Sequence, residues 1–107
     1  MLANKDSRMI TMLVTYAGDA DTPFDRDHWI NVHFPLVRES WAPYGLISAA
    51  GFFPQADGAG PIAVGVVNFR DMAAMEAALQ APETARVMAD VAIVTAVQPQ
   101  RSVLQPL

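Results

Sequence analysis

A helix interrupted by proline, between residues 24 and 46, constrains this chain more than any other stretch. Asp25 is a suitable N-cap, because its carboxylate can accept hydrogen bonds from the free N–H groups of a first helical turn. Further along, Pro35 has no N–H to bond the carbonyl of Asn31, and its ring clashes with that carbonyl. We therefore expect the helix to kink near His33, or a single turn to end there and a longer helix to begin at Pro35.

One face of this helix carries side chains at steps of three and four residues, namely Trp29, His33, Leu36, Val37 and Ser40. An imidazole beside an unpaired carbonyl suits a functional site, but a satisfied, half-buried histidine fits the same spacing equally well. His28 precedes His33 by five residues, which corresponds to about 140° around an ideal α-helix. We therefore expect His28 to face solvent near the first turn and not to share a site with His33.

The composition limits the classes of protein to consider. A chain of 107 residues has room for one domain, and a hydrophobic content of 52% predicts that some apolar surface lies in a subunit interface. The net charge of −4, without a basic run, argues against nucleic acid as a partner. No apolar stretch reaches the ~18 residues that a membrane span needs. The absence of cysteine excludes disulfides, thiolate metal sites and a cysteine nucleophile.

The first residues of the chain, 1–8, are polar and lack the apolar core of a signal peptide. We expect them to form a short disordered extension before a single domain at residues 9–107, and we expect the protein to be cytoplasmic.

Hydrophobic patterns predict four strands, at residues 9–16, 44–53, 62–69 and 96–104. Gly45 and Gly51 weaken the second strand and mark a bulge or the close approach of another backbone. The third strand is rich in β-branched residues, and its continuous apolar character predicts burial on both faces. Pro99 predicts that the last strand is bulged or lies at an edge of the sheet.

The remaining segments are loops at residues 17–23 and 54–61 and two helices, one capped by Asp71 and one beginning near Pro82. The resulting order is strand, helix, strand, strand, helix pair, strand. This order predicts an α+β, ferredoxin-like βαββαβ fold, whose antiparallel sheet carries its helices on one face. The other face is apolar in the first and third strands, so we expect a homodimer packed sheet on sheet.

The run His33-Phe34-Pro35-Leu36 follows an aromatic-rich helix start, and residues 87–91 and 97–99 add two further matching segments. On these residues the chain resembles the EthD family of the dimeric α+β barrel group, over essentially residues 9–107. The resemblance implies a dimeric α+β barrel with a pocket between sheet and helices in each subunit, and it implies that His33 lies at or near that pocket. Asp90 and Gln98 also match the family, although Asp90 could simply tie a helix end.

The chain departs from the family pattern at Trp29, where a tyrosine is common. An indole donates a hydrogen bond but cannot relay a proton as a phenol does. A paired tyrosine and histidine acting as acid and base is therefore not expected at this position.

His33 is the candidate catalytic residue, because an imidazole with a pKa near ~6.5 exchanges protons at neutral pH. The candidate ligand-binding residues share an expected position at the pocket, and they are Trp29, Tyr16, Asn68, Trp41 and Leu36. The aromatic ones could equally be ordinary core residues. We expect no metal, because two histidines that do not face each other and scattered carboxylates make no ligand cluster. We expect no cofactor, with haem on one axial histidine as the remaining alternative.

Three functions fit these residues. The first is a cofactor-independent isomerase, cyclase or lyase that acts on a small apolar organic molecule in catabolism or secondary metabolism, with His33 as general acid or base. The second is a ligand-binding accessory protein of an oxidative, P450-type degradation pathway, and the resemblance implies this oxidoreductase association. The third is a dimer with a purely structural role.

Overall fold

The computed structural model describes residues 8–56 and 60–107. Its four strands are β1 (Ile10–Ala17), β2 (Leu46–Phe52), β3 (Pro61–Phe69) and β4 (Gln100–Leu104). They form one sheet in the order β2-β3-β1-β4, and every neighbouring pair is antiparallel. Apart from Arg8, the predicted disordered extension lies outside the described residues, as do residues 57–59 of the predicted loop.

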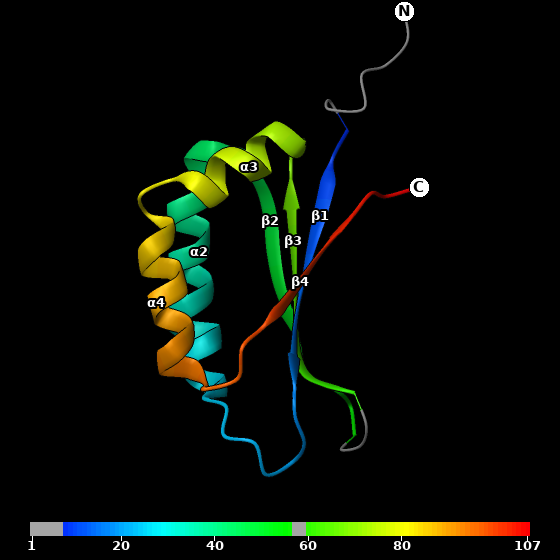
Figure 1. The fold of residues 1–107 in the computed structure, drawn as a ribbon, viewed down its shortest axis with the longest axis vertical. Helices are drawn as coiled ribbons and strands as arrows, with labels where there is room; N and C mark the ends of the chain where they lie inside the picture. Colours follow the sequence, from blue (N-terminus) through cyan, green and yellow to red (C-terminus); the bar gives the residue numbers. More distant parts are fainter. Residues whose placement is uncertain (1–7, 57–59) are drawn as a thin grey trace, which may run out of the picture.

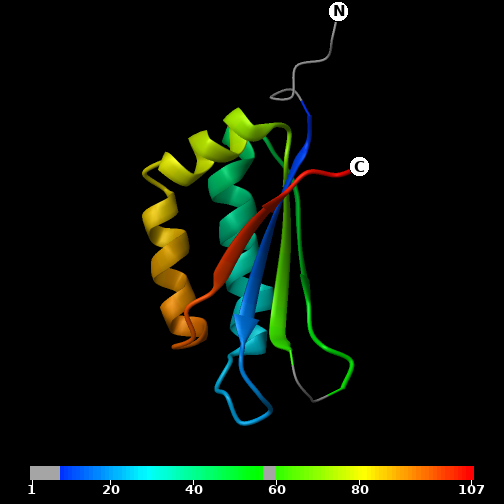
Figure 2. The same ribbon diagram turned by 45° about the vertical axis from the view of Figure 1, so that its right-hand side comes forward.

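The helices form a second layer on one side of this sheet (Figures 1 and 2). They are α1 (Arg26–His28), the π-helix η2 (Trp29–His33), α2 (Phe34–Trp41), the short 3-10 helix η3 (Ala42–Tyr44), α3 (Met72–Gln80) and α4 (Thr84–Val94). The element order and the sheet order are those of the α+β, ferredoxin-like fold, as expected from the sequence. No helix among the described residues is both long enough and apolar enough to span a membrane.

Three elements begin or end where the local chemistry requires it. Asp71 caps α3, since its carboxylate accepts a hydrogen bond from the Ala74 N–H, as predicted. Gly45 ends the α2–η3 segment with a φ of 95°, which favours glycine, so β2 is shorter than the predicted strand at residues 44–53. The predicted start of the last strand at residue 96 is wrong, because the chain bends at residues 96 and 97 and β4 begins directly after Pro99.

Alternating side chains give the sheet two different faces. On β1 and β3, Met12, Tyr16, Val67 and Phe69 are buried beneath the helices. The intervening residues point to the opposite side, where Val66 is only half-buried in the single chain. The prediction that the third strand is buried on both faces therefore does not hold within one chain.

Candidate functional site

The helix between β1 and β2 changes its hydrogen-bond pattern just before Pro35. Here the Phe34 N–H bonds the carbonyl of Trp29, five residues earlier, which is the π-helical pattern. Pro35 has no N–H to contribute to a regular α-helix at this point. The disruption expected near His33 thus takes the form of one wide turn between α1 and α2.

This wide turn brings both histidines to one carboxylate. Asp90 of α4 lies 2.9 Å from His28 Nε2 through Oδ1, and 3.0 Å from His33 Nδ1 through Oδ2. The expectation that His28 faces away from His33 is wrong, because the 140° separation applies to an α-helix. A π-helical turn holds more residues than an α-helical turn, so residues five apart lie closer to one face of the helix. Asp25 also holds the start of α1 against the end of α4, since its N–H donates to the Val94 carbonyl at 2.9 Å.

The network fixes where the protons lie. Burial alone would raise the pKa of the Asp90 carboxyl, but hydrogen bonds from His28 and His33 and the attraction of both rings outweigh it, so the pKa is lowered. An ionised carboxylate only accepts hydrogen bonds. Both histidines must therefore donate to it, His28 through Nε2–H and His33 through Nδ1–H. A neutral His33 then carries its lone pair on Nε2.

The environment keeps His33 neutral at pH 7. Its side chain is 7% exposed, and this burial lowers its pKa below the usual 6.5. The hydrogen bond and charge of Asp90 oppose this effect, whereas the charge of His28 adds to it. An unprotonated Nε2 whose ring is oriented by a carboxylate has the form that a general base needs.

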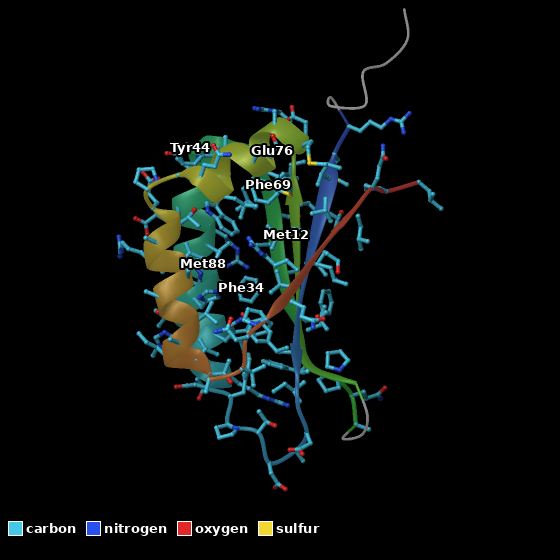
Figure 3. The ribbon with its side chains drawn as sticks, in the orientation of Figure 1. Met12, Phe34, Tyr44, Phe69, Glu76 and Met88 are labelled. Carbon is cyan, nitrogen blue, oxygen red and sulfur yellow. The ribbon has the colours of Figure 1, made fainter. Side chains whose placement is uncertain are left out.

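His33 lies at the wall of a cavity of about 510 Å³ between the sheet and the helices. Most of the lining is apolar or aromatic and comes from β1, β3, α2 and α4. In Figure 3, Met12 and Phe34 lie in this layer between sheet and helices. The bend before β4 and β4 itself add the polar residues Gln98 and Arg101. The cavity is therefore a largely apolar space with a few polar groups, as is typical of small-molecule sites.

The structure brings together most of the residues selected from the sequence. Tyr16, Trp29, His33 and Trp41 all line the cavity. The Tyr16 ring meets the Trp29 ring edge to face, with 5.9 Å between centroids. Burial raises the pKa of the Tyr16 hydroxyl, and a hydrogen bond from the Trp29 side chain partly opposes the rise. Tyr16 therefore stays protonated and keeps a donor beside the cavity.

Two selected residues lie outside the cavity. Asn68 follows the inward-facing Val67 on β3, so it points to the open face, where it accepts from Thr11 Oγ1 at 2.6 Å and donates to Ser48 Oγ at 3.0 Å. Leu36 is displaced because the wide turn delays the inward face of the helix by one residue. The inward positions are accordingly Trp29, His33, Phe34, Val37 and Trp41.

Sequence reasoning missed three features of the site. Phe34 was not selected, because an α-helical spacing does not place it beside His33. Arg101 was not selected because the predicted strand extended through Pro99, whereas residues 95–99 precede the strand and line the cavity together with Arg101. Asp90 had been matched to the family, but its two histidine partners depend on the π-turn.

Trp29 lies against the sheet because β2 carries a glycine beneath it. A Cβ added at Gly51 would lie 2.8 Å from both the Trp29 and the Phe34 ring, which is too close for any real contact. The close approach predicted at Gly51 is thus made by aromatic rings and not by another backbone. At Gly65, directly opposite on β3, the same addition would meet only ordinary contacts of 3.6 Å or more.

In residues 8–56 and 60–107, no group of three or more histidine, aspartate or glutamate side chains is placed to hold a metal ion. His28 Nε2 and His33 Nδ1 carry the protons that they donate to Asp90, so these two nitrogens are not available to a metal ion.

Comparisons with known proteins agree with this architecture. No family model matches the chain, and neither does any curated protein. An EthD-like protein from Ralstonia eutropha JMP134 is 21% identical, with a TM-score of 0.77 over 92% of each chain. An ethyl tert-butyl ether D (EthD) family protein from Bacillus halodurans C-125 is 15% identical, with a TM-score of 0.73 over 92% of this chain and 99% of that one. SnoaB, a cofactor-independent oxygenase from Streptomyces nogalater, is 12% identical, with a TM-score of 0.60 over 94% of each chain.

Proposed function

We propose that this chain, whose fold is that of the EthD-like proteins, binds a small apolar organic molecule in its cavity and exchanges a proton with it at His33. The observation that carries the proposal is the neutral His33 imidazole, which Asp90 holds through Nδ1 at the wall of the cavity. A volume of about 510 Å³ suits a drug-sized ligand. The likeness to SnoaB supports a place in oxidative metabolism.

The reaction that fits best is proton abstraction from a carbon next to a carbonyl group. His33 Nε2 takes the proton, and the Asp90 carboxylate stabilises the imidazolium that forms. The protonated Tyr16 hydroxyl, in the same cavity, is the donor available to the enolate oxygen. Return of the proton to another carbon completes an isomerisation. Isomerases, cyclases and lyases of carbonyl compounds all use this first step.

We further propose that the protein works as a homodimer. The open face of the sheet carries apolar side chains that are half-buried or exposed in the single chain, including Leu13, Val64, Val66, Phe52 and Leu104. Burying such a face needs a second sheet of matching character, and a second copy supplies one.

The proposal is tested by deuterium exchange. The probe is 2-tetralone, an apolar ketone with acidic protons at C1, whose exchange in D₂O is followed by proton NMR. The wild type should accelerate the exchange, and His33→Gln should remove the acceleration, because a glutamine amide cannot accept a proton. Glu39→Gln, an exposed substitution on α2, should have no effect.

The same variant distinguishes the proposed catalysis from the second candidate function, which is ligand binding without catalysis. His33→Gln should still bind the ketone, which can be followed through Trp29 and Trp41, the only two tryptophans of the sequence and both cavity residues. Quenching of their fluorescence in a wild type that catalyses no exchange would favour a ligand-binding accessory protein. Exchange at the wild-type rate in His33→Gln would contradict the assignment of the base.

A further inference from the structure

Arg101 gives the cavity a charge that the proposed proton exchange does not use. Among the described residues that line the cavity, it is the only permanently charged one, and none of these residues is acidic. The whole chain carries 11 acidic and 7 basic residues, for a net charge of −4. The lining itself therefore carries one positive charge, at Arg101, and this group can attract an anion.

The sheet places Arg101 at the far end of a row that begins under the aromatic rings. Gly51 pairs with Gly65, Gly65 pairs with Val14, and Val14 pairs with Arg101, so these residues lie side by side across all four strands. Trp29 lies over the two glycines at the β2 end of the row. Arg101 stands at the other end, on the edge strand β4, where it is exposed.

This arrangement fits a ligand with two unlike ends. An apolar ring system suits the end of the row beneath the aromatic rings, against Trp29 and Phe34. The guanidinium of Arg101 can hold a planar carboxylate through two parallel hydrogen bonds while remaining in contact with water. Gln98, which also lines the cavity, adds a side-chain amide from the same segment of chain.

We propose that the ligand is a ring-containing carboxylate, bound with its ring on Trp29 and its carboxylate on Arg101 at the edge of the sheet. This inference rests on the proposed function for the use of the cavity, and it adds the charge and the orientation of the molecule. Holding the carboxylate at Arg101 fixes which part of the ring system reaches His33.

The test compares two probes that differ only in charge, 2-naphthylacetic acid and 2-naphthylacetamide, by isothermal titration calorimetry at pH 7.5 and low salt. The wild type should bind the acid at least tenfold more tightly than the amide. Arg101→Gln should reduce the affinity for the acid about tenfold and leave the amide unchanged. Arg86→Gln, an exposed substitution on α4 outside the cavity lining, should keep the full preference for the acid.

Equal affinities of the wild type for acid and amide would overturn the inference. An Arg101→Gln variant that loses the same affinity for both probes would also overturn it. Binding of neither probe would overturn it as well. The proposed function fails separately, because exchange of the neutral 2-tetralone does not involve Arg101. A wild type that prefers the acid but exchanges no protons would retain this binding mode and lose the catalytic proposal.

Discussion

The two faces of the sheet use alternate residues of the same strands for different purposes. On the helix side, Met12, Tyr16 and Val67 are almost fully buried, and they lie against a cavity that also holds His33. On the open side, Leu13 and Val66 are only half-buried, although they are just as apolar. The first face is completed by helices of its own chain, whereas the second face is the one that we propose a second copy covers. A shift of one residue along a strand therefore separates a role in the site from a role in assembly.

The largest expected effect is the contrast between Val67→Asp and Val66→Asp. A buried carboxylate without a partner costs several kcal/mol, which is a large part of the stability of a small domain. Val67→Asp should therefore unfold the chain, since this residue is 4% exposed. Val66→Asp should give a folded monomer of 11.6 kDa in place of a dimer of twice that mass. Circular dichroism and light scattering measure both outcomes, and a dimer that survives Val66→Asp would contradict the role of the open face.

A smaller effect is expected on the helix side from loss of the carboxylate between the histidines. Asp90→Ala should cost about 3 kcal/mol, because two hydrogen bonds to a charged group are lost and the buried His33 N–H loses its acceptor. His28→Ala should cost less, since this side chain is 21% exposed and water can replace its partner. Urea denaturation measures both, with the exposed Glu76→Gln on α3 as control (Figure 3). If Asp90→Ala lowers the free energy of unfolding no more than the control does, the network does not contribute to the stability of the fold.

The two glycines beneath the aromatic rings provide a matched pair. Gly51→Ala should destabilise by about 1–3 kcal/mol, because the new methyl group overlaps the Trp29 and Phe34 rings. Gly65→Ala should be neutral or slightly stabilising, since its methyl group meets only ordinary contacts and the unfolded chain loses freedom. Thermal unfolding of both variants decides the matter. Equal effects at the two positions would mean that the Trp29 ring does not pack against Gly51 of β2.

The pH dependence of stability should be the smallest effect. His33 has a lowered pKa in the folded state, so the unfolded chain takes up a proton near pH ~6.5 that the folded chain does not. Stability should therefore be complete above that pH and fall on acidification below it, by up to ~1.4 kcal/mol per pH unit. Asp90, also with a lowered pKa, adds a further loss below its unfolded pKa of 3.8. His33→Gln should remove the first decline and keep the second, and urea midpoints at several pH values test this.

The sequence predicts the fold well, because its signals are local or periodic. Alternating strands and the Asp71 cap each depend on neighbouring residues, and the order of elements then leaves few topologies. The site is harder to predict from the sequence, because it depends on which alternate residues of a strand point inward and on which period the helix follows. Asn68 was assigned to the wrong face, since an unbroken apolar strand does not say which alternate residues point inward. His28 was assigned to the wrong side and Phe34 was not selected, because an α-helical period was used across a π-turn.

Pro35 could have indicated that turn, since it removes the backbone bond that an α-helix needs there. The choice between a kink, a break and a wide turn is settled by packing, through Trp29 on Gly51 and Asp90 on both histidines. These contacts join residues that are far apart in the sequence. No local pattern contains them.

The most direct test of the account is the protonation state of His33, measured by ¹⁵N NMR of the imidazole nitrogens during a pH titration. The chain has only two histidines, and the His33→Gln variant assigns their signals. The account predicts that neutral His33 carries its proton on Nδ1 and that its pKa lies below 6.5. A proton on Nε2, or a pKa above 6.5, would contradict the inference that Asp90 holds His33 as a base with an unprotonated Nε2.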